Sequence, residues 1–211
     1  MNSTTRRLTG TALLMALAAT GAAQAAPASY TIDPAHTYPS FEADHFGGLS
    51  TWRGKFNSTA GKVTLDKAAG TGSVDITVDT ASIDFGLDKM NEAARGTELF
   101  DVTKYPKATY HGTLAGFVNG APTKVTGELT LHGVTQPLDL TLNSFKCMPH
   151  PMYKRELCGA DAIASFKRDA FGMDSGKAYG FKMDVVLRIQ VEALIDESSN
   201  TGKVALATPQ H

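Results

Sequence analysis

The chain has 211 residues, a formal net charge of −1 and two cysteines. A length of this order is usual for one domain, and all-β barrels often reach it without dividing. The scattered Lys and Arg residues exclude the clustered basic face of a nucleic-acid-binding protein, so no nucleic-acid partner is expected.

The first 25 residues have the pattern of a secretory signal peptide. Arg6 and Arg7 precede an apolar stretch, LTGTALLMALAATGAA, that is too short to span a bilayer with charged flanks. Ala23-Gln24-Ala25 then fits the small-x-small rule for cleavage. Cleavage after Ala25 would leave residues 26–211 as a single domain and, because two arginines and no acid are removed, would change the formal charge from −1 to −3. We therefore expect an exported protein without stable membrane insertion.

Beyond the signal peptide the dominant hydrophobic period is two, which is typical of half-buried β-strands. Strands are predicted, in chain order, at SYTID, SFEADHF, WRGKFNSTAGKVTLD, SVDITVDT, ATYHGTLAGFV, VTGELTL, LDLTL, CGADAIASFKRDAFG and FKMDVVLRIQVEA. The sequence HGVTQP separates two of them, and Gly133 there suits a hairpin turn with positive φ. The stretch GLDKMNEAARGTELF lacks the alternation and predicts one short helix from about Leu87 to Arg95.

Eight or nine antiparallel strands with one helical insertion predict an all-β fold, either a barrel or a sandwich. The difference bears on function. A sandwich packs its inner faces solid, whereas a barrel of about eight strands can hold one small ligand. Composition alone does not separate the two.

The stretch DPAHTYPSFEADHFGG is rich in groups that could bind a metal or act in catalysis. Alternation places Phe41 and His45 on one face of its strand and the acids Glu42 and Asp44 on the other. A histidine–carboxylate pair within the strand is therefore not expected, and His36 precedes the strand in a turn. His45 is either a polar contact inside a cavity or a hydrogen-bonded histidine of the wall.

Two cysteines, Cys147 and Cys158, remain after export, and an even number in an oxidising compartment favours a disulfide. Pro149 and Pro151 between them indicate a connection and not a strand. The alternative is a metal site that uses both thiols and His150, but this set lacks a fourth ligand and the tight spacing of zinc motifs.

Four segments resemble the YceI-like family of exported bacterial, lipocalin-like barrels. They are YTIDPAHTYPSFEADHFGG, ELFDVTKYPKATY, GELTLHGVTQPLDL and SFKRDAFGMD, and the resemblance runs in order from about Tyr30 to Ile195. It implies an apolar tunnel that binds a polyisoprenoid or another long-chain amphiphile in the periplasm, with no cofactor and no reaction. Two positions depart from the family pattern, Ala93 in place of a histidine and Leu99 in place of a phenylalanine. The missing histidine weakens the case for a polar ligand contact from the helix.

The leading interpretation is non-enzymatic binding, transport or storage of a long-chain apolar or amphiphilic ligand. Strand register and the helix, which would close one end, give the expected ligand-binding residues: Phe41, His45, Met90, Leu99, Phe100, Phe166, Arg168, Phe181, Met183 and Val185. Arg168 could bind an oxyanion through its guanidinium, or it could form a rim ion pair with Asp169 or Asp174.

Two other classes of function stay open at this point. One is a small periplasmic hydrolase or isomerase, although no Gly-x-Ser-x-Gly or His-Glu-x-x-His motif is present. The other is a metal or haem carrier, although the internal histidines do not have helical i, i+4 spacing. We expect no catalytic residue, metal or cofactor; a homodimer remains open.

Overall fold

The structure is a computed structural model, and it describes residues 27–199. The elements of this part of the chain are, in order, β1 (Ala28–Ile32), β2 (Tyr38–His45), β3 (Ser50–Phe56), β4 (Thr59–Asp66), β5 (Thr71–Asp79), the 3₁₀ helix η1 (Thr80–Ser82), β6 (Ile83–Asp84), α1 (Asp88–Arg95), β7 (Lys107–Ala115), β8 (Lys124–Leu131), β9 (Val134–Pro137), β10 (Leu140–Pro149), β11 (Glu156–Lys167), the 3₁₀ helices η2 (Arg168–Phe171) and η3 (Lys177–Tyr179), and β12 (Asp184–Ile195). The predicted signal peptide and its cleavage site lie outside the described residues.

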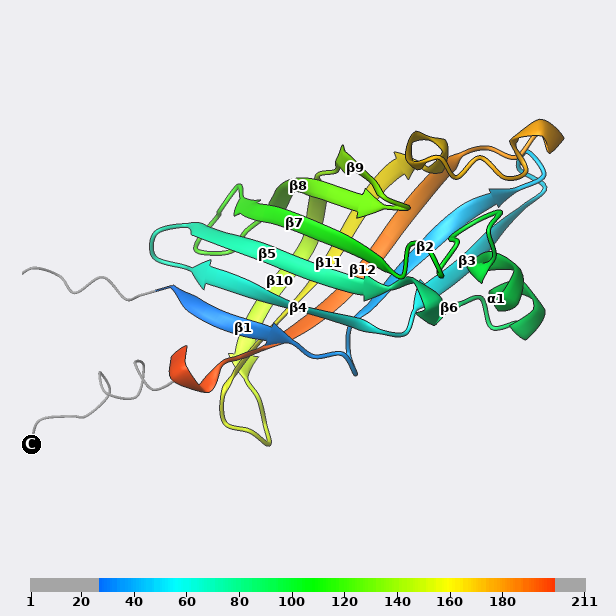
Figure 1. The fold of residues 1–211 in the computed structure, drawn as a ribbon. Helices are drawn as coiled ribbons and strands as arrows, with labels where there is room; N and C mark the ends of the chain where they lie inside the picture. Colours follow the sequence, from blue (N-terminus) through cyan, green and yellow to red (C-terminus); the bar gives the residue numbers. More distant parts are fainter. Residues whose placement is uncertain (1–26, 200–211) are drawn as a thin grey trace, which may run out of the picture.

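Eight of these strands close into an antiparallel barrel (Figure 1). The ring runs β1, β4, β5, β7, β8, β10, β11 and β12, and it closes because β1 pairs with both β4 and β12. Closure removes the exposed edges that an open sheet would have. The predicted lipocalin-like barrel is therefore confirmed, and the sandwich alternative is wrong.

Strand β12 pairs with two strands, one after the other, along one of its edges. Its last residues, Ala193–Ile195, pair with β1, whereas residues 185–190 pair with β2. β1 and β2 thus lie one after the other along the same edge of β12. β2 continues outward to β3 and β6, so these three strands form a flap beyond the closed ring, and α1 follows β6 at that end (Figure 1).

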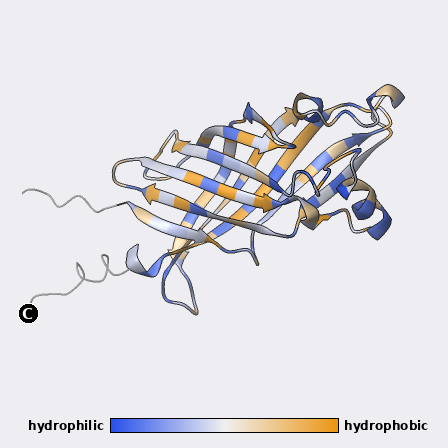
Figure 2. Ribbon diagram, viewed as in Figure 1, coloured by the Kyte–Doolittle hydropathy of each residue, from blue (hydrophilic) through white to orange (hydrophobic). Residues whose placement is uncertain are grey.

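Hydrophobic and polar residues alternate along the strands (Figure 2), as the period of two predicts, so each strand has one apolar face. On β12 the inward set is Val185, Leu187, Ile189, Val191 and Ala193. On β10 the register with β11 shifts between Leu142 and Ser144, which is the mark of a β-bulge. Because of this shift the cavity is lined by the even-numbered Leu140 and Leu142 and then by the odd-numbered Phe145.

The helix and the hairpin turn were predicted well. α1 spans Asp88–Arg95, one residue shorter than expected. His132 and Gly133 have φ of +52° and +76°, and Leu131 pairs with Val134 across them. Two successive residues with positive φ are typical of the tight turns that join antiparallel strands.

Several strand boundaries differ from the predictions, and three of these lie at the flap end of the barrel. The stretch from Trp52 to Asp66, predicted as one strand, forms two strands. The chain turns between them, where the backbone N–H of Asn57 donates to the Ser82 carbonyl. The segment after Lys167 forms η2 and not more strand, since Gly172 adopts φ of +73° and turns the chain. The last strand begins at Asp184, so Phe181 and Met183 precede it.

Asp196 anchors the closing strand to its neighbours. Its carboxylate accepts hydrogen bonds from Lys62 Nζ (2.8 Å), Thr31 Oγ1 (2.6 Å) and Ser29 Oγ (2.8 Å). The hydrogen bond from Lys62, followed by the one from Thr31, lowers the pKa of Asp196 to about 2. The end of β12 is thereby tied to β1 and β4. Among residues 27–199, no helix is both long and apolar enough to cross a bilayer.

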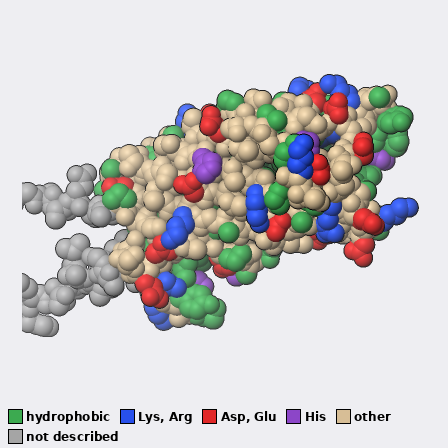
Figure 3. Space-filling model, viewed as in Figure 1, with side chains coloured by type: hydrophobic (Ala, Val, Ile, Leu, Met, Phe, Trp, Pro, Cys, Tyr) green, Lys and Arg blue, Asp and Glu red, His purple; other side chains and the backbone are tan. Residues whose placement is uncertain are grey.

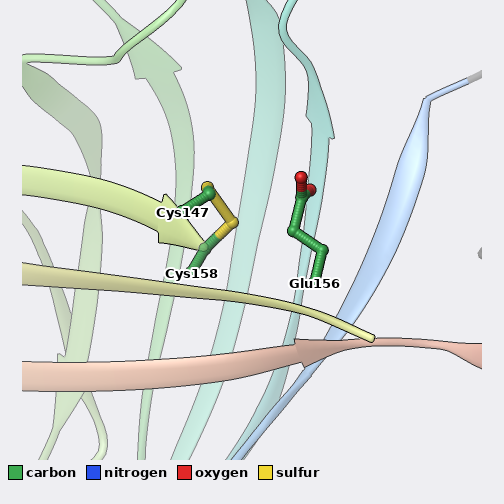
Figure 4. A group of neighbouring side chains, drawn as sticks. All are labelled: Cys147, Glu156 and Cys158. Carbon is green, nitrogen blue, oxygen red and sulfur yellow. A yellow bond between two sulfur atoms is a disulfide. The ribbon is translucent and has the colours of Figure 1, made fainter. Parts of the chain in front are cut away.

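The predicted disulfide is present, and it joins Cys147 to Cys158 (Figure 4). The cysteines face each other on β10 and β11 with Cα atoms 4.0 Å apart. The connection between the cysteines is shorter than predicted, because β10 continues to Pro149 and β11 begins at Glu156. The proline is tolerated because it ends its strand. Because both thiols are used in this bond, they cannot serve as ligands of the alternative metal site.

Removing the disulfide should leave the barrel folded but less stable. For Cys147→Ala/Cys158→Ala we expect the free energy of unfolding to fall by about 2–3 kcal/mol, because the oxidised unfolded chain is constrained by the crosslink. Urea unfolding with and without reductant measures this, and the double variant, which should not respond to reductant, is the control. Thiol titration of the unfolded, unreduced protein should detect no free thiol; two reactive thiols there would contradict the disulfide.

Candidate ligand-binding cavity

The barrel encloses a cavity of about 460 Å³, within the range of small-molecule sites. Its wall consists almost wholly of apolar side chains from the inward faces of the strands. The small side chains of Ala160 and Ala162 on β11 leave space opposite the larger residues of β5 and β7, such as Ile76 and Leu114. The cavity therefore follows directly from the alternation of the sequence and from closure of the ring.

An aromatic cluster lines the cavity beneath the flap. The Phe41 ring lies 5.7 Å from Phe56 and 5.4 Å from Phe85, and Phe56 lies 5.6 Å from Phe100, all measured between ring centroids. Gly54 permits this packing, since a Cβ there would lie 2.5 Å from the Phe41 ring. These contacts favour an apolar ligand and shape this part of the wall.

Helix α1 contributes to the wall next to this cluster, with Met90 in the lining. Asn91, which is buried, fixes the helix: its Oδ1 accepts a hydrogen bond from the Phe85 N–H (2.7 Å) and its Nδ2 donates to Asp84 (3.1 Å). Arg95 Nε donates to the Ala81 carbonyl (2.8 Å) at the other end of the helix. The helix that carries Met90 is thus held in position by polar bonds made away from the cavity.

Arg168 is the cationic group of the cavity wall. Its guanidinium donates to the carbonyl oxygens of Met173 (2.7 Å) and Ser175 (2.6 Å), and its pKa is lowered, chiefly by burial. The predicted rim ion pair with Asp169 or Asp174 is wrong, because the guanidinium bonds loop carbonyls and Asp169 pairs with Lys177 (2.6 Å). Arg168 therefore shapes the loop that follows β11 while facing the cavity.

Two tyrosine hydroxyls in the wall also have fixed partners. Tyr30 donates to Glu156, whose carboxylate pairs with Lys67 (3.0 Å). Tyr110 donates to the Leu138 carbonyl (2.9 Å). Burial raises the pKa of both tyrosines, so each remains a neutral hydrogen-bond donor.

Most of the residues predicted to bind ligand line this cavity, and two do not. The lining contains Phe41, Met90, Leu99, Phe100, Phe166, Arg168, Phe181 and Val185. Met183 is buried but outside the lining, because β12 begins only at Asp184 and does not set its register. His45 also lies outside it, stacked on Trp52 at 4.5 Å. Contact of any of these residues with a ligand stays a prediction.

Several lining residues were not singled out from the sequence. Trp52 shares the register of Gly54 and Phe56 on β3, so counting back in steps of two would have found it. Phe85 had no such signal, because it lies in the irregular segment between β6 and α1. Asp44 lines the cavity at the end of β2, where its carboxylate turns to accept the Lys182 and Gly47 N–H groups (both 2.8 Å).

The described histidines lie outside the cavity lining. His36 pairs with Asp33 (2.7 Å) in the predicted turn, and His111 pairs with Asp75 on the outer surface. Asp33, His36 and Glu192 offer ligand atoms within 4.8 Å of one another, but Asp33 already accepts hydrogen bonds from His36 and from the Ala35 N–H. The polar groups of DPAHTYPSFEADHFGG therefore stabilise its turns and, through Glu42, form cross-strand ion pairs with Arg53 (3.1 Å) and Arg188 (3.2 Å).

Comparison with known proteins agrees with this geometry. The sequence matches the YceI-like domain over residues 30–193. A UPF0312 protein of Pseudomonas aeruginosa is 31% identical over 188 residues, which are 87% of this chain and 95% of that protein. A UPF0312 protein of Vibrio parahaemolyticus is 35% identical over 138 residues, which are 64% of this chain and 71% of that protein.

Two solved structures have a similar fold. Burkholderia cenocepacia BcnA superposes with a TM-score of 0.61 at 24% identity, covering 76% of this chain and 98% of BcnA. A polyisoprenoid binding domain from Saccharophagus degradans superposes with a TM-score of 0.56 at 16% identity, covering 80% of this chain and 99% of that domain. The domain match spans almost the whole barrel, and the chain belongs to the YceI-like family.

Proposed function

We propose that the protein binds one long-chain apolar or amphiphilic molecule, of the polyisoprenoid or fatty-acid type, in the barrel cavity. The observation that carries this proposal is a cavity of about 460 Å³ whose wall is almost wholly apolar. Burial of a chain contributes about 0.8 kcal/mol per CH₂. A twelve-carbon chain thus gains about 10 kcal/mol, which offsets much of an association cost of about 4–15 kcal/mol.

The distribution of polar groups supports one orientation of an amphiphile. Asp44, Arg168 and Ser175 lie in the lining at the end that carries the flap and the 168–183 loop. The lining from the closed half of the ring is largely apolar, with Leu65, Leu114 and Cys158 among it, and its Tyr30 and Tyr110 hydroxyls are already hydrogen-bonded. A polar head group would lie near Arg168, and the chain would extend into the closed half of the barrel.

Binding without chemistry is the better-supported function. In the part of the chain that the structure describes, the polar side chains of the wall are largely committed to structural bonds, as Arg168 and Tyr110 are. A hydrolase or isomerase would need a nucleophile or base directed into the cavity. The Saccharophagus neighbour is described as a polyisoprenoid binding domain, which agrees with the proposed ligand class.

The proposed site of action is the periplasm. The pattern of residues 1–25 is typical of export, and a disulfide between strands suits an oxidising compartment. The mature protein would then be residues 26–211, a single domain, and would carry or store its ligand between membranes.

Mass spectrometry of an organic extract from the purified protein tests this function. We expect about one long-chain molecule per protein chain, released on unfolding and absent from a buffer control. A protein that carries no extractable lipid, and takes up no fatty acid or isoprenoid alcohol offered from detergent, would contradict the proposal. Circular dichroism before extraction verifies that the barrel was folded.

A further inference from the structure

Three large apolar side chains are exposed on two neighbouring loops at the flap end of the molecule. Leu49 and Phe46 lie in the β2–β3 turn with exposed fractions of 77% and 54%, and Tyr179 in η3 is 78% exposed. The two loops lie side by side at the right of Figure 1, and hydrophobic side chains gather at that end of the surface in Figure 3. We call Phe46, Leu49 and Tyr179 the apolar rim.

The rim is held together by specific contacts between its loops. The Asp44 carboxylate accepts hydrogen bonds from the N–H groups of Gly47 and Lys182, both at 2.8 Å, and so joins the two segments. The Phe46 ring lies 4.8 Å from Phe181, and a Cβ on Gly47 would lie 3.1 Å from the Gly180 carbonyl. Ordering these loops in advance lowers the entropic cost of docking.

The rim is continuous with the cavity wall. His45 packs between Trp52 (4.5 Å), Phe46 (4.6 Å) and Phe181 (5.2 Å). Trp52 and Phe181 both line the cavity, whereas Phe46 is exposed. An unbroken set of aromatic contacts thus leads from the surface to the interior.

We propose that the apolar rim docks on the surface of a lipid bilayer, where the protein takes up or delivers its ligand. This inference rests on the proposed function, because an apolar cargo is found in membranes. Phe, Leu and Tyr beside an exposed lysine, here Lys182, are the residues that seat a protein at the membrane interface. Three side chains on two loop tips are too few for a stable protein interface, which needs about 800 Å² on each partner.

A second exposed apolar group gives a matched control. Met148, Met152 and Tyr153 are exposed on the β10–β11 hairpin, and β11 pairs there with the end of β12, so the hairpin lies at the opposite end of the barrel. Met152 is 73% exposed, close to the value for Leu49. A charge at Met152 therefore tests whether removing any exposed apolar side chain has the same effect.

The first test is sedimentation with vesicles of phosphatidylethanolamine and phosphatidylglycerol. We expect the wild type and Met152→Asp to sediment with vesicles, and Leu49→Asp/Tyr179→Asp to bind roughly tenfold or more weakly. The protein has one tryptophan, Trp52, so brominated lipids should quench its fluorescence in the wild type and not in the double variant. Leu49→Asp alone serves if the double variant does not fold.

The second test separates docking from ligand binding. Met152→Asp and Leu49→Asp/Tyr179→Asp should both take up a fatty acid from detergent as the wild type does. From vesicles, the double variant should take it up more slowly than the wild type. Equal vesicle binding by the double variant and the wild type would overturn the docking proposal, as would a dimer in sedimentation velocity that the rim substitutions abolish. A wild type that binds vesicles but no ligand would instead contradict the proposed function.

Discussion

Ala162→Phe is expected to exclude the ligand while the barrel stays folded. Ala162 lines the cavity from β11, opposite Leu142 on β10 and Ile189 on β12. A benzyl group there would project into the hollow and occupy the space of several methylene groups. Losing contact with three methylenes costs about 2.4 kcal/mol, which is more than a tenfold loss in affinity. The measurement is ligand recovered per protein chain.

The fold should tolerate this substitution, because the added ring enters empty space and not a packed core. Filling a cavity commonly raises stability by about 0.5–2 kcal/mol, so we expect the Tm of the ligand-free variant to be maintained or raised. Ser165→Phe on the exposed face of β11 is the control and should keep the full ligand load. A folded Ala162→Phe protein with the wild-type load would place the ligand elsewhere.

The period of two made the barrel largely predictable from the sequence. Each strand had one apolar face, and the order of the family motifs indicated that the sheet closes around a hollow. Gly127 lies in the inward register between Val125 and Leu129, and the structure explains the missing side chain, since a Cβ there would lie 2.6 Å from the Tyr110 hydroxyl. The strand register was thus enough to predict the fold and most of the residues of the cavity wall.

Features that depend on the backbone of irregular segments were not predictable. Nothing in LTLNSF marks the shift between Leu142 and Ser144, which turns Phe145 inward. Met183 continues the alternation of β12 in the sequence, but its carbonyl accepts the Arg168 N–H (2.8 Å) before the strand begins. The partners of Arg168 are carbonyl groups, which every residue carries, so no side-chain pattern could reveal them.

Arg168→Met is expected to destabilise the protein and to disorder the loop that covers the flap end of the cavity. The guanidinium donates to the Met173 and Ser175 carbonyls, and its loss leaves both without this partner beside an apolar wall. Hydrogen bonds from a charged group contribute about 1.5–3 kcal/mol each, and because the two act together we expect a loss of about 3 kcal/mol. Urea unfolding measures the loss, and amide exchange at residues 173–175 should accelerate.

Two further variants distinguish the fork geometry of Arg168 from its charge. Arg168→Lys keeps the cation but cannot present two N–H groups in one plane, so we expect it to recover only about half of the lost stability. Arg188→Met removes an exposed arginine that pairs with Glu42 (3.2 Å), and surface pairs of this kind contribute about 0–1 kcal/mol. Full recovery by lysine would mean that charge, and not the two carbonyl bonds, is what the loop requires. If Arg168→Met were as stable as the wild type but bound anionic amphiphiles less tightly than neutral ones, the side chain would serve the ligand head group and not the loop.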